Sequence, residues 1–248
     1  MNKIVYLLFI CFFSLSAQNK DLFQEANTAY NEGNYSEAIN NYERILENGE
    51  TSAELYYNLA NAHYKLSQIA PSIYYYEKAL QLNPGDSDVK NNLEFAQRML
   101  IDKIEEVPKT GLLKIINKLI SVLSFNGWAW TAVIGSILFA AFFLLYYFSN
   151  SSRQKRLFFS TSIIALIIML SALIFAFQQQ EYNKNSQFAI IFSEEAILRN
   201  EPTLRSDEIL RLHEGTKVKI LETFQNWIKF ELANKIQGWT DKSDVRFL

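Results

Sequence analysis

Two long runs without a charged residue constrain the fold of this 248-residue chain most strongly. Residues 128–148 and 157–177 each span 21 positions and contain no Asp, Glu, Lys or Arg. At about 1.5 Å per residue, a helix of that length measures roughly 31 Å, which is enough to cross the hydrocarbon core of a bilayer. A buried hairpin in a soluble protein is the alternative. The two runs predict a pair of transmembrane helices.

The segment between these runs indicates their orientation. Residues 149–156 contain Arg153, Lys155 and Arg156, and short loops rich in positive charge stay in the cytoplasm. We therefore expect a cytoplasmic loop at 149–156. The outer ends of both helices, followed by a polar linker at 178–187, then lie in the periplasm of a two-pass protein of a bacterial inner membrane.

The N-terminus has the features of an export signal. Lys3 precedes an apolar run at residues 4–13, and a small residue, Ala17, follows at a suitable cleavage position. Residues 1–17 are therefore predicted to be a signal peptide, with an uncleaved anchor as the alternative. Cys11, the single cysteine of the chain, lies in this segment, which excludes a disulfide framework and a cysteine-based zinc site.

A second membrane-associated segment is predicted just before the first span. Residues 111–125 alternate with helical period, and Lys114, Asn117 and Lys118 share one face. We interpret residues 108–127 as an amphipathic helix on the membrane surface. A helix packed under the preceding domain is the alternative.

Residues 18–107 contain an internal repeat. Its period is 34 residues, which aligns Ala26 with Ala60. The same offset aligns Asn27 with Asn61, Tyr30 with Tyr64, Tyr42 with Tyr76, Glu43 with Glu77, and Leu46 with Leu80. This period and the second copy, residues 53–86, resemble the tetratricopeptide repeat, a helix-turn-helix unit. We expect two full repeats and one capping helix, five helices in all.

Residue size explains this pattern. Ala26, Ala38 and Ala60 permit close helix crossings, and the large side chains of Tyr42 and Tyr76 fill the space between helices. Gly33 suits the turn between the first two helices. A final set of apolar residues at helical spacing predicts the capping helix: Val89, Leu93, Ala96 and Leu100.

The pattern changes to period two in residues 188–248, which predicts a small all-β domain. We expect about five short strands, including 196–199, 217–221 and 227–230, closed into a barrel. Glu214-Gly215-Thr216-Lys217-Val218 and Gly238-Trp239 resemble the bacterial SH3 domain. Trp227 and Trp239 could line a peptide groove or build the core. Because the membrane hairpin separates this domain from the repeats, we expect the two domains to fold independently.

No pattern for catalysis, a metal or a cofactor emerges from the sequence. The two histidines, His63 and His213, fall in different predicted domains, and neither has a partner at metal-ligand spacing. Asp86 and Asp88 fit a turn and a helix N-cap better than a calcium loop. The formal net charge of −2 excludes a nucleic-acid binder driven by bulk positive charge. We therefore expect a protein without enzymatic activity, cofactor, small-molecule substrate or nucleic-acid partner.

The resemblance to tetratricopeptide repeats implies a binding groove on the first helix of each pair. Its predicted lining is Phe23, Asn27, Tyr30 and Asn31 from the first copy, with Tyr57, Asn58, Asn61, Tyr64 and Lys65 from the second. Asparagines that only join neighbouring helices are the alternative. Residues 18–108 have 7 basic and 15 acidic side chains, which favours a basic or neutral partner.

The order of these parts resembles the BatE proteins of the Bacteroides aerotolerance group: signal, tetratricopeptide pair, membrane hairpin and C-terminal SH3 domain. The resemblance implies a membrane scaffold or adaptor that works with von Willebrand A-type membrane proteins and a MoxR-type ATPase, with a role in aerotolerance or stress. A sensor that binds cell-wall peptides through the SH3-like domain is the alternative. The predicted fold class is thus a helical array, two transmembrane helices and an SH3-like barrel.

Overall fold

The computed structural model describes residues 19–105, 111, 115–116, 119–185 and 187–248. The chain divides into two compact units, one made of residues up to 107 together with 187–248, and the other of residues 108–186. The predicted signal peptide at 1–17 and most of the predicted surface helix before residue 119 lie outside the described residues.

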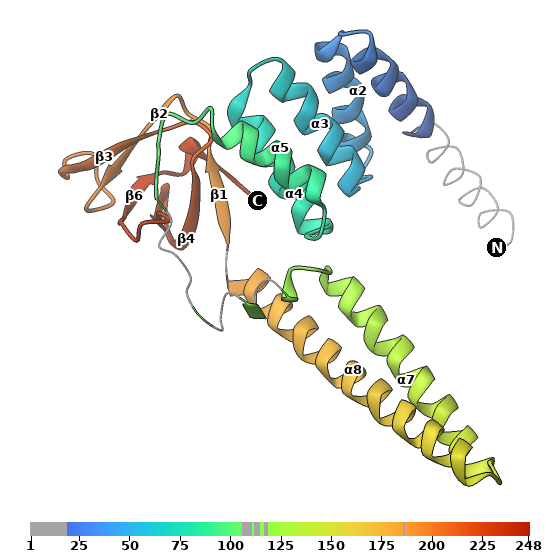
Figure 1. Ribbon diagram of the computed structural model, residues 1–248. Coiled ribbons are helices and arrows are strands. Elements are labelled where there is room, and N and C mark those ends of the chain that lie inside the picture. The colour runs from blue at the N-terminus through green and yellow to red at the C-terminus, as the bar shows by residue number, and fades with distance from the viewer. Residues whose placement is uncertain (1–18, 106–110, 112–114, 117–118, 186) are drawn as a thin grey trace, which may run out of the picture. The chain divides into compact units, whose positions relative to one another are not determined.

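The first unit begins with the five helices that the repeat predicts (Figure 1). Residues 19–31 form the first helix. It is followed by α2 (Tyr35–Glu47), α3 (Ala53–Lys65), α4 (Ile69–Leu82) and α5 (Ser87–Gln97). The side chain of Ser52 caps α3 by accepting from the Leu55 N–H, and Asp86 caps α5 by accepting from the N–H groups of Asp88 and Val89. The sequence analysis assigned Asp86 and Asp88 to a turn and a helix N-cap; Asp86 is the N-cap, and Asp88 lies in the first turn of α5.

The turns inside the two helix pairs have the same geometry. Gly33 and Ser67, which are one repeat period apart, both have positive φ angles, of 85° and 58°. Equivalent backbone hydrogen bonds close the two turns. In the first, Gly33 N–H donates to the Tyr30 carbonyl, and in the second, Ser67 N–H donates to the Tyr64 carbonyl. Glycine adopts this left-handed conformation without steric cost, whereas Ser67 does so against its preference.

The core of the array consists of the residues that the period singles out. Ala26, Ala38 and Ala60 are fully buried, and Tyr42 and Tyr76 are buried to all but 1% of their surface. Val89, Leu93 and Ala96 of α5 join the same core. The predicted packing of small residues against large aromatic rings is therefore present in both repeats.

The second unit is a hairpin of two long apolar helices, α7 (Phe125–Phe148) and α8 (Ser152–Asn185). Both contain stretches that are long and apolar enough to cross a membrane. The connection is shorter than the predicted loop 149–156, because Arg153, Lys155 and Arg156 already lie in the first turns of α8. The predicted linker 178–187 is also helical as far as Asn185.

Small residues allow α7 and α8 to pack closely. Ala132 and Gly135 of α7 are buried, as are Ala165, Ala172 and Ala176 of α8. A Cβ at Gly135 would lie 3.2 Å from Cβ of Met169, which is closer than most such contacts. Large apolar side chains such as Ile137 and Ile164 point outward and are exposed. Small residues at the helix contact with large ones outside are typical of membrane helix pairs.

The C-terminal part of the first unit is an antiparallel sheet with the strand order β3-β2-β6-β5-β4-β1-β7 (Figure 1). Its strands are β1 (Phe188–Ile191), β2 (Glu195–Arg199), β3 (Glu208–His213), β4 (Lys217–Phe224), β5 (Trp227–Glu231), β6 (Gln237–Asp241) and β7 (Val245–Phe247), with a short 3-10 helix at Lys242–Asp244. Its core lies on one face and includes Leu198, Leu212, Ile228 and Phe230.

This sheet differs from the prediction in two ways. The sequence analysis did not identify β1, β3 and β7 as strands. In addition, the ladder within residues 187–248 ends at β3 and β7, which do not pair with each other. The sheet is open along its hydrogen-bonded edge, so the predicted closed barrel is not confirmed.

Candidate functional site

A hydrogen-bonded row of asparagines and tyrosines connects the helices of the repeat array. The hydroxyl of Tyr42 donates to Oδ1 of Asn27 at 2.6 Å, and Nδ2 of Asn58 donates to the same oxygen at 3.2 Å. The second repeat has the same arrangement at the equivalent positions. Tyr76 donates to Oδ1 of Asn61 at 2.5 Å, and Nδ2 of Asn92 donates to it at 2.9 Å.

The tyrosines of this row keep their protons over the whole physiological range. Burial raises the pKa of Tyr42 to about 12, with a smaller contribution from Tyr30 nearby. Burial, with contributions from Tyr57 and Tyr30, also raises the pKa of Tyr76. Both hydroxyls therefore act as donors, and the asparagine oxygens accept from them.

The remaining residues of the predicted groove lie on the same helices in different environments. In each helix pair, a ring of the first helix packs against a ring of the second helix. The ring centroids of Phe23 and Tyr42 are 5.8 Å apart, and those of Tyr57 and Tyr76 are 6.1 Å apart. The nine predicted residues divide by exposure. Asn31 and Lys65 are exposed, and the half-buried ones are Phe23, Asn27, Tyr30, Tyr57, Asn58, Asn61 and Tyr64.

The hydrogen bonds of Asn27 and Asn61 therefore match the alternative that these side chains join neighbouring helices. Their Oδ1 atoms each accept two hydrogen bonds from within the array. An oxygen with two partners has little capacity left for a ligand. The exposed residues of the predicted groove, Asn31 and Lys65, are better placed to contact a partner.

His63, which the sequence analysis left without a role in metal binding, is a packing residue. It is only 6% exposed, its ring stacks on Tyr75 at 5.4 Å, and its Nδ1 lies 2.6 Å from Oε1 of Gln68. Burial lowers the pKa of the His63 ring, so it stays neutral at pH 7. Among the described residues, no three His, Cys, Asp or Glu side chains are grouped to hold a metal ion.

The repeat array and the sheet contact each other directly, a contact that the expectation of two independently folding domains did not include. Asp102, which follows α5, accepts hydrogen bonds from the His213 N–H at 2.6 Å, from Nδ1 of His213 at 2.8 Å and from the Thr216 hydroxyl at 2.7 Å. Burial alone would raise the pKa of Asp102, but these hydrogen bonds outweigh it and hold the pKa below its ordinary value. One carboxylate thus fixes the β3–β4 turn against the end of the array.

Other contacts extend this junction along α4. Nζ of Lys217 lies 2.6 Å from Oε2 of Glu77. The guanidinium of Arg246 lies over the rings of Tyr74 and Phe192, at 5.6 and 4.2 Å from their centroids. Ile190 of β1 belongs to the core of the repeat array rather than to that of the sheet. Strands β1 and β7 and the β3–β4 turn therefore cover the end of the array.

The two tryptophans of the predicted SH3-like groove share one face of the sheet. The β5–β6 register pairs Trp227 with Asp241 and Lys229 with Trp239. Because side chains alternate along a strand, both rings lie on the face opposite the buried Ile228. Both tryptophans are half-buried, which leaves part of each ring open to a ligand.

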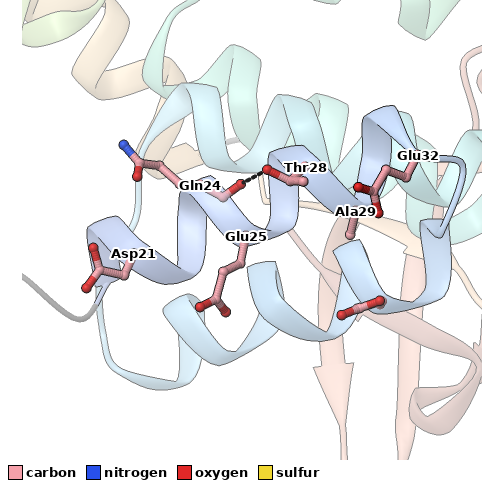
Figure 2. Close-up of a pocket in the computed structure, with 7 residues that line it drawn as sticks. Asp21, Gln24, Glu25, Thr28, Ala29 and Glu32 are labelled. Carbon is pink, nitrogen blue, oxygen red and sulfur yellow. Dashed lines mark hydrogen bonds between the residues drawn. The ribbon is translucent and has the colours of Figure 1, made fainter.

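An acidic hollow of about 540 Å³ lies on the first repeat (Figure 2). Five of its lining residues come from the first helix, Glu32 comes from the turn that follows it, and Glu37 comes from α2. Four of the seven are carboxylates, and the set is Asp21, Gln24, Glu25, Thr28, Ala29, Glu32 and Glu37. The negative charge of this domain was evident from its composition, whereas the hollow was not.

Comparison with known proteins gives three results. The model of the tetratricopeptide repeat family matches residues 23–87. The structure of YrrB, described as a TPR protein with an unusual peptide-binding site, is 15% identical, covers 67% of this chain and 76% of its own, and has a TM-score of 0.32. An NLPC/P60 family protein from Bacillus cereus is 24% identical over 28% of this chain, with a TM-score of 0.22.

The chain covers only 23% of the length of the Bacillus cereus protein. No curated protein matches the sequence. The family match coincides with the two helix pairs whose hydrogen bonds recur at equivalent positions. The chain therefore contains tetratricopeptide repeats, and these occupy its N-terminal helical array.

Proposed function

We propose that this protein is a non-enzymatic membrane scaffold that binds protein partners through its repeat array and its C-terminal sheet. The observation that carries the proposal is a tetratricopeptide array joined in one chain to two helices long and apolar enough to cross a membrane. Repeat arrays of this kind present extended binding surfaces. The helix pair would hold that surface at the bilayer.

The contact between the array and the sheet supports a two-pass topology. Asp102 precedes the apolar hairpin and His213 follows it, and the two residues are hydrogen bonded. Residues in contact lie on one side of a membrane, so the chain between them must cross an even number of times. With Arg153, Lys155 and Arg156 at the hairpin tip, the positive-inside rule favours a periplasmic position for both soluble parts.

Reporter fusions test this topology. We expect periplasmic activity from fusions after residue 105 and at the C-terminus, and cytoplasmic activity from a fusion after residue 150. Export by a cleaved signal predicts a mature protein that starts at Gln18, which N-terminal sequencing of the purified protein can check. Cytoplasmic activity at the C-terminus would contradict the proposal.

Resemblance to BatE proteins supplies candidate partners. A von Willebrand A-type membrane protein and a MoxR-type ATPase system are the partners that the resemblance implies, in a complex linked to aerotolerance or stress. The open sheet would act as the SH3-like module of that complex. The acidic lining of the first repeat favours a basic or neutral partner segment.

Capture of these partners from detergent-solubilised membranes tests the binding role. We expect the full-length protein to retain a von Willebrand A-type protein, and Asn31→Ala with Lys65→Ala to reduce that capture. Both side chains are exposed, so the fold should persist. Asn40→Ala with Lys90→Ala changes two exposed residues of the same types on α2 and α5 and should leave capture intact. Equal capture by all three proteins would remove the proposed binding surface.

A wall-binding sensor is the second candidate, because Trp227 and Trp239 lie half-exposed on one face of the sheet. Retention of the full-length protein on purified peptidoglycan tests it. Under this candidate, Trp239→Ala abolishes retention, whereas Asn31→Ala with Lys65→Ala leaves it unchanged. The full chain is required, since the sheet packs against the array.

A further inference from the structure

The face of the sheet that carries the two tryptophans divides into two parts. On β1 and the start of β4 this face packs against the array, because Ile190 belongs to the array core and Lys217, its cross-strand neighbour, pairs with Glu77 of α4. Trp227 and Trp239 lie further across the same face, on β5 and β6. They are therefore separate from the contact that holds the sheet against the array.

Lys229 lies between the two tryptophans. It is directly opposite Trp239 in the β5–β6 register, and it follows Trp227 by two residues along β5. Side chains directly opposite each other have Cβ atoms about 4.5–5.5 Å apart, and residues two apart on a strand share a face. The three side chains therefore form one continuous surface, which we call the tryptophan face: Trp227, Lys229 and Trp239.

The polar groups of the tryptophan face have no partner among the described residues. Neither indole N–H donates a hydrogen bond, and both indole nitrogens reach the surface. Lys229 is half-buried, yet its ammonium group forms no ion pair with a described carboxylate. Arg199, the cation on the other side of Trp239, is already engaged, because it donates to the Ser206 carbonyl at 2.7 Å. The face thus presents two indole donors and one ammonium group to a ligand.

A carboxylate borders this face next to Lys229. Glu222 of β4 is opposite Lys229 in the β4–β5 register, so the order across the sheet is Glu222, Lys229 and Trp239. Glu222 is exposed, and it forms no ion pair with Lys229 or with another described residue. An ion pair at a protein surface contributes only about 0–1 kcal/mol, so a ligand can compete for both charges.

These groups define the chemistry of a complementary ligand. A carboxylate of the ligand accepts hydrogen bonds from the ammonium group of Lys229 and from the indole N–H groups. An amino group of the ligand pairs with Glu222, and aliphatic parts of the ligand pack on the indole rings. Glu222 would repel a polyanion such as a nucleic acid or an anionic lipid surface. A short peptide with both a free carboxylate and a free amino group matches every group.

We propose that the tryptophan face and Glu222 bind wall peptides that have a free carboxylate and a free amino group. The carboxylate pairs with Lys229, and the amino group pairs with Glu222. This inference rests on the wall-binding candidate, and it names the ligand and two further residues that determine specificity. Because cross-linking of wall peptides converts the amino group into an amide, the site should prefer peptides that are not cross-linked.

Three forms of one synthetic peptide test this proposal. The first is N-acetylated alanyl-γ-glutamyl-lysyl-alanyl-alanine, in which the carboxylates and the lysine amine are free. The second has its carboxylates amidated, and the third has its lysine amine acetylated. Binding to the full-length protein in detergent is measured by isothermal titration calorimetry. We expect the first form to bind at least about tenfold more tightly than either of the others.

Substitutions should remove the two preferences separately. Lys229→Gln should abolish the preference for free carboxylates and keep the preference for a free amine, and Glu222→Gln should do the reverse. The matched controls are Lys78→Gln, a half-buried lysine of α4, and Glu194→Gln, an exposed glutamate just before β2. Both controls should keep both preferences. Each comparison is made within one variant, so a partial loss of folded protein does not imitate the expected pattern.

The outcomes separate this proposal from wall binding itself. Unchanged preferences in Lys229→Gln and Glu222→Gln would overturn the proposal. If Trp239→Ala still abolishes retention on purified peptidoglycan in that case, wall binding stands and only the ligand chemistry is wrong. Equal competition by glycan strands from which an amidase has removed the peptides would assign the face to sugars and would also overturn the proposal. If neither the peptides nor peptidoglycan bind, both wall binding and this inference are wrong.

Discussion

The interior of the repeat array and its junction with the sheet are stabilised by different kinds of contact, although the array and the sheet form one unit. Inside the array the same hydrogen bonds recur from one repeat to the next, from Tyr42 to Asn27 and from Tyr76 to Asn61. At the junction with the sheet no contact repeats, and one carboxylate, that of Asp102, accepts three hydrogen bonds. The array spreads its stability over equivalent units, whereas the junction depends on single residues.

This difference predicts how damage spreads. A change inside the array removes the platform on which β1 and β7 pack, since Ile190 shares the array core. A change at the junction leaves the repeated hydrogen bonds of the array untouched. A destabilising substitution in the array should therefore also unfold the sheet, whereas a substitution at the junction should leave the array folded.

The largest effect is expected for Ala60→Trp. Ala60 is fully buried at a helix crossing, and overpacking costs about 1–3 kcal/mol or more. We expect the array to unfold and the sheet to lose its protection at the same temperature, measured by circular dichroism and limited proteolysis of the full chain. Glu54→Trp, at an exposed position of the same helix, should have little effect. A sheet that stays protease-resistant after the array melts would show that the two parts are independent.

Asn27→Ala combined with Asn61→Ala should have the next largest effect. The buried hydroxyls of Tyr42 and Tyr76 lose their acceptors, which costs about 1–3 kcal/mol at each site. The thermal midpoint of the full chain should fall, whereas Asn31→Ala at an exposed position should leave it unchanged. An unchanged midpoint with reduced partner capture would instead assign these asparagines to ligand binding.

Gly215→Ala should weaken the junction specifically. Gly215 has a φ of 85°, and a Cβ there would lie 2.6 Å from Cδ2 of Leu100 and 3.2 Å from Cδ1 of Ile73. Backbone strain and the clash together should cost about 1–3 kcal/mol. Gly33→Ala is the matched control, because its φ is also 85° but nothing lies within 4 Å of the added Cβ. The rate of proteolysis at the junction of the array and the sheet should increase only for Gly215→Ala. Equal rates for the two variants would argue against a packed junction.

Periodicity explains which parts of the fold could be predicted from the sequence. The array could be, because local spacing determines which helix faces pack, and Ala26 and Ala60 mark the crossings at a fixed offset. Strand β1 was missed because Phe188–Ile191 is a continuous apolar run without alternation, three of whose four residues are buried. Its Ile190 packs on the array, and no local pattern encodes a partner so distant in sequence.

The candidate site was predicted in part for the same reason. Sequence offsets located Asn27 and Asn61 on the first helices, but their partners, Asn58 and Asn92, lie on the first helix of the following repeat. No sequence pattern pointed to Asp102, since its hydrogen-bond donors lie 111 and 114 residues away in the chain. The apolar runs were located by hydrophobic length, which identifies a span but places its ends only within several residues, as at Phe125 and Asn185.

The smallest effect concerns the junction carboxylate itself. Asp102→Asn keeps the size of the side chain but replaces one acceptor oxygen by a donor, which opposes the donors of His213 and Thr216. We expect a loss of about 1–2 kcal/mol at pH 7, measured as the free energy of unfolding of the full chain. The contribution of Asp102 also has a definite pH dependence, because its pKa is lower in the folded protein than the ordinary value of 3.8.

A lowered folded-state pKa means that the unfolded chain binds a proton more readily than the native one. The contribution of Asp102 is therefore complete above about pH 4 and is lost as the pH falls through the lowered pKa. The stability difference between wild type and Asp102→Asn should accordingly be present at pH 5 and shrink towards zero below pH 3.8. Glu77→Gln, which removes the other carboxylate of the junction, should leave this titration in place. A wild-type advantage that persists at pH 2 would mean that the charge of Asp102 does not hold the sheet against the array.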